Sequence, residues 1–124
     1  MREAQRSVVL NLTSGRAIEG ARNGKHYAAS GAEMVAMTKT LALEWAQSEI
    51  REIAIIPGVS ETQQPLKAPG VTLKKLRERG AKLPLGRVGH LSDIAVKVMM
   101  LLSKEASFVI GQSIAINSGA IMRP

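Results

Sequence analysis

Three short apolar segments, each bounded by polar residues or a turn, most constrain how this chain can fold. They are residues 7–13 (SVVLNLT), 50–56 (IREIAII) and 108–117 (FVIGQSIAIN), and their length and composition are typical of buried strands. Segments with helical periodicity separate them, at residues 26–47 and 91–103. Strands that alternate with helices pair in parallel through right-handed crossovers. We therefore expect an α/β fold with a parallel sheet.

Length and composition are those of one small globular domain, residues 1–124. The hydrophobic content is 45%, and no segment approaches the roughly 18 apolar residues that a membrane helix needs. The chain has no cysteine, which excludes disulfides and thiolate metal sites, and we expect no metal. The N-terminus lacks the apolar stretch of a secretory signal. We expect a cytoplasmic protein without a membrane partner.

The net charge of +7 raises the hypothesis of nucleic-acid binding. Basic residues occur in several separate segments, and the chain has one Phe, one Tyr and one Trp to stack on bases. Nucleic acid is therefore the less favoured partner. A solvated basic surface, or one that attracts a phosphorylated cofactor or an acyl carrier, is our interpretation.

The segment 26–47 carries two apolar stripes at helical spacing, which predict two buried faces. One stripe is Met34, Met37, Leu41 and Trp45; the other is Ala28, Ala32, Val35, Ala42 and Ala46. One face can cover a sheet, and the face of small residues suits close packing against another helix, including one from a second subunit.

The remaining segments are predicted from turn and capping signals. We expect loops at residues 14–25 and 59–71, because both are interrupted by Gly or Pro. A short basic helix, TLKKLRERGAK, ends near Gly80. Ser92 is the expected N-cap of the helix at 91–103, and Asp93 is well placed for the helix dipole.

Five segments in order carry a resemblance to a known family: VVLNLTS, YAAS with TKTLALEWA, IAIIPGVSET, PLGRVGHLSDIA and ASFVIGQSIAINSG. Together they resemble the C-terminal half of the short-chain dehydrogenase/reductase family. This implies a partial Rossmann-like, doubly wound parallel sheet made of the last three strands and their flanking helices. The dinucleotide-binding half with its TGxxxGxG turn has no counterpart in the sequence.

The same resemblance implies roles for particular residues. Ser14 and Tyr27 have the spacing of the family's substrate-binding serine and proton-donating tyrosine. The family's lysine, one helical turn after the tyrosine, lowers the phenol pKa and binds the nicotinamide ribose; Gly31 stands here. Pro57, Gly58 and Thr62 resemble the segment that contacts the cofactor.

Because of Gly31 and the missing half, we expect a truncated pseudoenzyme. The resemblance implies an NAD(P)-dependent oxidoreductase of carbonyl or enoyl substrates that is inactive alone. It leaves two branches open, one like 3-oxoacyl-ACP reductases and one like enoyl- or dienoyl-CoA reductases, the latter because of "SGAEMVAMTKTLALEW". The intact family uses NAD or NADP, and we expect neither to bind this chain alone. A further departure is IREI where IRVN is usual, which places Glu52 on a buried strand.

Two other functions remain open. The first is a non-catalytic interaction module that forms homo-oligomers through the helix at 26–47 and the last strand. The second is nucleic-acid binding by the basic helix. A small-molecule carbonyl or an acyl thioester would bind only to a completed fold.

Overall fold

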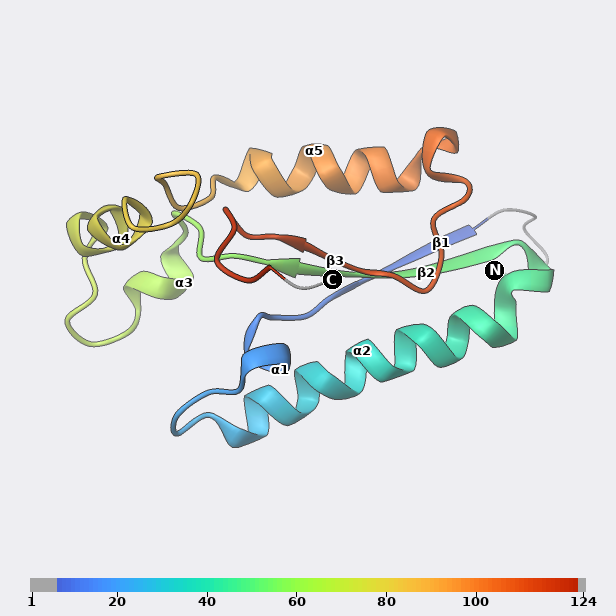
Figure 1. Ribbon diagram of the computed structural model, residues 1–124, viewed down its shortest axis with the longest axis horizontal. Coiled ribbons are helices and arrows are strands. Elements are labelled where there is room, and N and C mark those ends of the chain that lie inside the picture. Colours follow the sequence, from blue (N-terminus) through green and yellow to red (C-terminus); the bar gives the residue numbers. More distant parts are fainter. Residues whose placement is uncertain (1–6, 123–124) are drawn as a thin grey trace.

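A sheet of three parallel strands in the order β1-β2-β3 forms the centre of the structure, a computed structural model that describes residues 7–122 (Figure 1). The strands are β1 (Ser7–Leu12), β2 (Ile50–Pro57) and β3 (Ser113–Ile116). In the register, Ser7 pairs with Ile50 and Ala54 with Ser113. The predicted α/β fold with a parallel sheet is therefore confirmed. The ends of the expected domain, residues 1–6 and 123–124, lie outside the described part.

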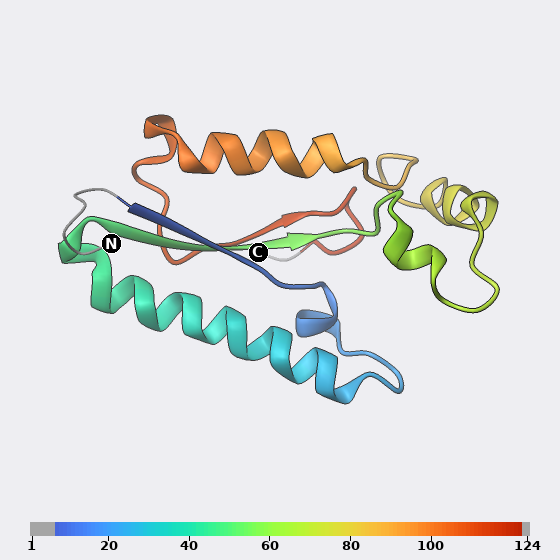
Figure 2. The same ribbon diagram turned by 180° about the vertical axis from the view of Figure 1, so that it is seen from behind.

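Helices cover both faces of this sheet (Figure 2). One face carries α2 (Lys25–Trp45), with the short α1 (Arg16–Glu19) beside its first turns, and the opposite face carries α5 (Leu91–Leu102). Beyond the carboxyl ends of the strands lie α3 (Gln63–Leu66) and α4 (Leu73–Gly80). Two 3₁₀ turns, η1 (Ala46–Ser48) and η2 (Lys104–Ala106), follow α2 and α5.

The core between the sheet and α5 is apolar. Ile53 and Ile55 of β2 are fully buried and pack with Leu101 of α5. Val8 and Leu10 of β1 pack against the same cluster. This is the expected consequence of a central strand with a neighbour on each side and a helix over it.

The interface between the sheet and α2 contains a buried polar cluster instead. Asn11 donates through Nδ2 to Oγ1 of Thr38, at 3.0 Å, and to Oε2 of Glu52, at 3.3 Å. Glu52 is 1% exposed and Thr38 is fully buried. Burial raises the pKa of the Glu52 carboxyl above its ordinary value. The expectation that Glu52 lies on a buried strand agrees with the structure.

The two stripes of α2 behave differently from the prediction of two buried faces. Thr38 and Ala42 are its buried residues, whereas Ala32 and Ala46 are exposed and Met37 is 40% exposed. Within the described residues one face of α2 covers the sheet. Pairing of the other face with a further helix stays a prediction.

Other boundaries need correction. The expected loops at 14–25 and 59–71 contain the one-turn helices α1 and α3, which are too short to show periodicity. The third strand covers the four residues Ser113–Ile116 and not the predicted 108–117, and Phe108 is fully exposed. The N-cap of α5 is His90 and not Ser92.

Candidate functional site

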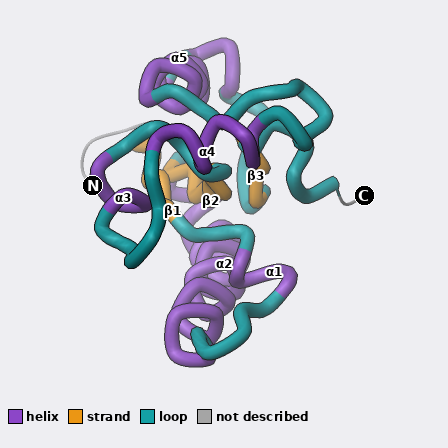
Figure 3. Tube along the Cα trace, turned by 90° about the vertical axis from the view of Figure 1, so that its left-hand side faces the viewer, coloured by secondary structure: helices purple, strands orange, loops and turns teal. Residues whose placement is uncertain are grey.

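The predicted site residues of the strand ends lie at one edge of the sheet, which faces the viewer in Figure 3. Ser14 follows β1 by two residues, Pro57 ends β2 and Gly58 follows it. In open parallel sheets, ligands bind in the crevice outside the carboxyl ends of the strands. The parallel topology therefore gathers Ser14 and the Pro57–Gly58 turn at the edge where a ligand is expected.

One hydrogen bond links the end of β1 to the start of α2. The Thr13 hydroxyl donates to the backbone oxygen of Gly31 at 2.9 Å. Gly31 lies one helical turn after Tyr27, and Thr13 directly precedes Ser14. This contact ties the segment of Ser14 to the helical turn that follows Tyr27, a link that the sequence pattern did not predict.

Ala17 of α1 and Thr13 leave little space for a side chain at Gly31. A Cβ added there would lie 2.9 Å from Cβ of Ala17 and 3.0 Å from Oγ1 of Thr13. The absence of a side chain lets α1 approach α2 closely, which explains a glycine inside a helix where it is otherwise unfavourable by about 1 kcal/mol. A lysine at this position has no room unless α1 moves.

Ser14 and Tyr27 have separate surroundings. The hydroxyl of Ser14 accepts from the backbone N–H of Arg16 at 3.3 Å, and its carbonyl accepts from Ala17 N–H at 2.9 Å. Tyr27 is the third residue of α2 and is 55% exposed. Among the described residues no hydrogen bond joins the two side chains. The phenol thus faces solvent at the start of the helix.

The Pro57–Gly58 turn is shaped by its neighbour strand. Gly58 N–H donates to the oxygen of Ile116 at 2.9 Å, and a Cβ on Gly58 would lie 2.6 Å from Cα of Asn117. Gly58 is therefore required for close approach of two backbones. Thr62 precedes α3, and its N–H donates to the oxygen of Ser60 at 2.8 Å.

A hollow of about 160 Å³ lies between the ends of β2 and β3 and the start of α5. Gly58, Arg87, Asp93 and Asn117 line part of it, whereas Ser14, Tyr27, Pro57 and Thr62 do not. Arg87 and Asp93 belong to the sequence segment GRVGHLSD, and neither is among the predicted site residues.

Arg87 and Asp93 form a bidentate ion pair beside this hollow, with distances of 2.6 and 2.9 Å. The Asp93 carboxylate also accepts from the backbone N–H of His90 at 2.7 Å. The Arg87 guanidinium, and then the N–H of His90, hold the pKa of Asp93 well below its usual range. This arrangement fixes the start of α5 and is complete without a ligand.

The described residues hold no group of three or more His, Cys, Asp or Glu side chains suited to a metal ion. In residues 7–122, no helix is both long and apolar enough to cross a membrane.

Comparison with known proteins places this geometry in a family. Residues 1–120 match the family described as enoyl-(acyl carrier protein) reductase. A structure of a short-chain dehydrogenase/reductase from Brucella melitensis is 34% identical, with a TM-score of 0.78 over 94% of this chain and 44% of that one. The chain belongs to the short-chain dehydrogenase/reductase family.

Two further short-chain dehydrogenases/reductases show how similar the chain is to its relatives and how much of their length it spans. The 3-oxoacyl-[acyl-carrier-protein] reductase of Thermotoga maritima is 38% identical over 92% of this chain and 45% of its own length. The 3-ketoacyl-(acyl-carrier-protein) reductase of B. melitensis, solved with NADH, is 30% identical, with a TM-score of 0.80 over 94% of this chain and 45% of that one. The chain thus spans about 45% of the length of these relatives.

The residues present do not fit a complete nicotinamide site of this family. Gly31 supplies no ammonium, and Ala17 occupies the space beside it. The predicted catalytic residues that the structure describes are Ser14, whose hydroxyl accepts from the N–H of Arg16, and the exposed Tyr27.

Proposed function

We propose that this chain forms the substrate side of an oxidoreductase that acts on a carbonyl group or an enoyl thioester, and that it is inactive alone. The observation that carries the proposal is the Thr13–Gly31 hydrogen bond, which holds the Ser14 segment against the helix of Tyr27 at the carboxyl edge of the sheet. In this role Ser14 donates a hydrogen bond to the substrate oxygen, and Tyr27 supplies its proton.

The chain spans about 45% of the length of its relatives, and this supports inactivity of the isolated chain. Dinucleotides are bound by a glycine-rich turn and a helix N-terminus, and each charge-assisted contact of this kind contributes about 1.5–3 kcal/mol. Loss of several such contacts weakens a micromolar site, worth about 8 kcal/mol, to beyond millimolar. A titration of NADPH with the purified chain, followed by NADPH fluorescence, should show no saturable enhancement.

A chimaera tests the catalytic roles directly. The N-terminal part of the T. maritima reductase, up to the point where the match begins, would be joined to this chain. We expect NADPH-dependent reduction of a 3-oxoacyl thioester to be slow with Gly31 and faster with the pair Gly31→Lys and Ala17→Gly. Tyr27→Phe should abolish the faster reaction. A chimaera that folds but reduces neither a 3-oxoacyl nor an enoyl thioester, even with the pair, would refute the proposal.

A non-catalytic interaction module is the second candidate, favoured by the exposed apolar residues of α2 and around β3. Leu43 is 84% exposed and Phe108 is fully exposed. Apolar side chains of this size on the surface often mark contact sites. In this function, α2 and the last strand pair copies of the chain.

A further inference from the structure

Glu52 places a carboxyl group inside the interface between the sheet and α2. It lies on the central strand β2, is 1% exposed, and shares the α2 side of the sheet with Asn11 of β1. Ile53, the next residue of the strand, packs on the α5 side instead. A carboxylate in such an interface is unfavourable unless a cation or several hydrogen bonds compensate it. The protonation state of Glu52 therefore matters for how α2 packs.

A chain of hydrogen bonds connects this carboxyl group to the backbone of α2. The amide nitrogen of Asn11 carries two hydrogens, and it donates to Oε2 of Glu52 at 3.3 Å and to Oγ1 of Thr38 at 3.0 Å. The Thr38 hydroxyl donates in turn to the backbone oxygen of Met34 at 2.9 Å. Asn11 thus bridges β2 and α2, and a change at Glu52 reaches the helix through two hydrogen bonds.

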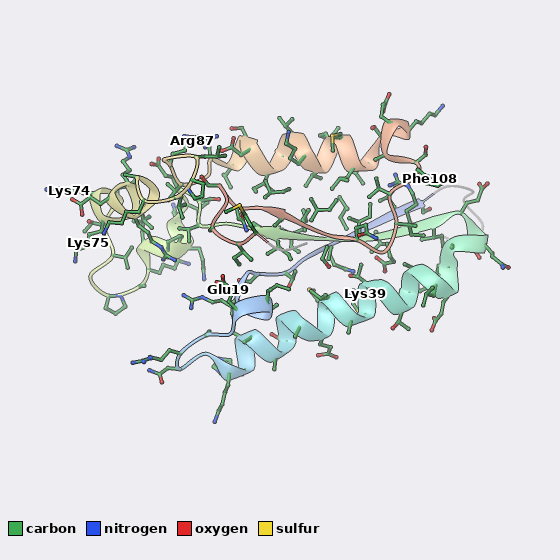
Figure 4. The ribbon with its side chains drawn as sticks, in the orientation of Figure 1. Glu19, Lys39, Lys74, Lys75, Arg87 and Phe108 are labelled. Atoms are coloured by element: carbon green, nitrogen blue, oxygen red, sulfur yellow. The ribbon has the colours of Figure 1, made fainter. Side chains whose placement is uncertain are left out.

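Within residues 7–122, no basic side chain on the elements around Glu52 is buried beside it. Strands β1 and β3 contain no titratable residue. Arg51, the neighbour of Glu52, donates to the backbone oxygens of Leu101 and Val109 on the α5 side. The titratable residues of α2, and the glutamate that precedes β2, are all exposed, and Figure 4 labels Lys39 among them. They are Lys25, His26, Tyr27, Glu33, Lys39, Glu44 and Glu49.

The same face of β1 holds α2 at a second point, close to the candidate site. Two residues after Asn11, the Thr13 hydroxyl donates to the backbone oxygen of Gly31. Gly31 follows Tyr27 by about one helical turn and precedes Thr38 by about two. Two polar contacts therefore hold the helix of Tyr27 along β1, and Glu52 can alter the one at Thr38.

We propose that Glu52 is a proton-operated switch that sets how firmly α2 is held on the sheet, and that it acts through Asn11 and Thr38. With Glu52 protonated, Asn11 serves both acceptors and the helix packs closely. When the proton leaves to solvent, the hydrogen bond from Asn11 to the carboxylate becomes charge-assisted and stronger. It draws the amide away from Thr38, water enters beside the carboxylate, and α2 loosens around Thr38.

The consequence of this switch for catalysis rests on the proposed function, because it concerns the position of Tyr27 relative to Ser14. The movement itself is measured in the full chain without substrate or cofactor. A chain that shows the movement but supports no reduction would leave the switch intact and refute the proposed function. A chain that shows no movement would refute the switch alone.

An NMR titration from about pH 4 to about pH 8 follows the carboxyl of Glu52 and the side-chain amide of Asn11. We expect both signals to change with one shared midpoint, above the ordinary glutamate value of about 4.3. The Asn11 signal should stop titrating in Glu52→Gln and keep its midpoint in the control Glu44→Gln. Different midpoints for the two signals, or a Glu52 midpoint at the ordinary value, would overturn the proposal.

Hydrogen exchange of backbone amides shows whether the helix moves. Comparison with Glu52→Gln at the same pH cancels the intrinsic pH dependence of exchange. At about pH 8 we expect the amides of residues 39–45 to be at least about fivefold less protected in the unmodified chain, and at about pH 4 to be equally protected. The amides of α5 should lose protection by a smaller factor. Equal losses in α2 and α5 would mean that Glu52 affects only the stability of the whole chain, and the switch would be wrong.

A pair of threonine variants tests the bridge. Thr38→Val keeps the shape of the side chain and removes the acceptor for Asn11. We expect the pH-dependent loss of protection in α2 to shrink to that of α5. The matched control is Thr40→Val, since Thr40 makes the same kind of hydrogen bond, to the oxygen of Ala36 at 3.2 Å, on the exposed side of α2. It should keep the full loss. If Thr38→Val keeps the full loss as well, the helix responds without the bridge and the proposal is overturned.

Discussion

A methyl group on Gly31 of α2 would lie 2.9 Å from the Cβ of Ala17 on α1. We therefore expect Gly31→Ala to destabilise the chain by about 1 kcal/mol. The substitution improves helix propensity by about 1 kcal/mol, but overpacking of this kind typically costs about 1–3 kcal/mol. Urea unfolding of the two proteins measures the difference.

The double variant separates the two contributions. In a chain that already carries Ala17→Gly, the closest contact is removed and that with Oγ1 of Thr13 at 3.0 Å remains, so Gly31→Ala should stabilise by less than about 1 kcal/mol. If Gly31→Ala stabilises equally with Ala17 present, the close contact of α1 and α2 is not a constraint on position 31.

Glu52 should make stability fall as pH rises. Burial raises its pKa in the folded chain, so the folded state keeps a proton that the unfolded state releases. The free energy of unfolding therefore decreases from the ordinary glutamate range up to the raised pKa, and stays lower above it. Glu52→Gln, which preserves an acceptor for Asn11, should remove this decrease and stabilise the chain by about 1 kcal/mol near pH 7.

The control for Glu52 is Glu44→Gln on the exposed side of α2. It should leave the pH dependence of unfolding unchanged. A Glu52→Gln chain that is less stable than the unmodified one at neutral pH would show that the carboxylate is stabilised by its surroundings.

Asp93 should have the opposite dependence. Its pKa is lowered by Arg87 and by the N–H of His90, so the folded state favours the carboxylate. This stabilisation is present above the ordinary aspartate range, near pH 4, and is lost as pH falls toward the folded pKa. Asp93→Asn should reduce stability at pH 7 and flatten the acid limb of the unfolding curve. If the acid limb of the unfolding curve is unchanged in Asp93→Asn, groups other than Asp93 cause the loss of stability in acid. Glu33→Gln, on the exposed surface of α2, serves as the control and should leave the acid limb unchanged.

Leu43 should influence assembly. It is 84% exposed on α2, and the proposed interaction between copies would bury it. We expect dimers or larger species at tens of micromolar, and a shift toward monomer with Leu43→Glu. The matched control is Leu85→Glu between α4 and α5, at a leucine that is 71% exposed. Sedimentation equilibrium measures both; an unmodified chain that is monomeric at these concentrations would contradict the prediction.

The alternation of short apolar segments with longer helical ones was sufficient to predict the sheet, because β2 is a nearly continuous apolar run and α2 is a helix of 21 residues. The Pro57–Gly58 turn also ended β2 as predicted. Short elements were missed: α1 and α3 each span a single turn, and one turn contains too few residues for a pattern.

Positions of the site residues were predictable only by resemblance and topology. A parallel sheet brings the residues after its strands to one edge, so Ser14 and Gly58 could be placed together. The contact of Gly31 with Ala17 was not predictable, since it depends on how α1 folds back on α2. Met37 was expected on a buried face of the helix at 26–47 but is 40% exposed, because an apolar residue on a helix does not reveal which face meets a partner.

The position of Glu52 on β2 has a consequence for how the chain folds. β2 is the central strand of the described sheet, and its partner β3 is made after it during synthesis. Until then one edge of the segment IREIAII is unpaired, and an unpaired apolar edge invites association. In the unfolded chain the carboxylate is ionised at neutral pH, and a charge within such a stretch hinders intermolecular strand pairing. The residue that we expect to lower the stability of the finished sheet at neutral pH should thus hinder wrong pairing of the same strand before the sheet exists.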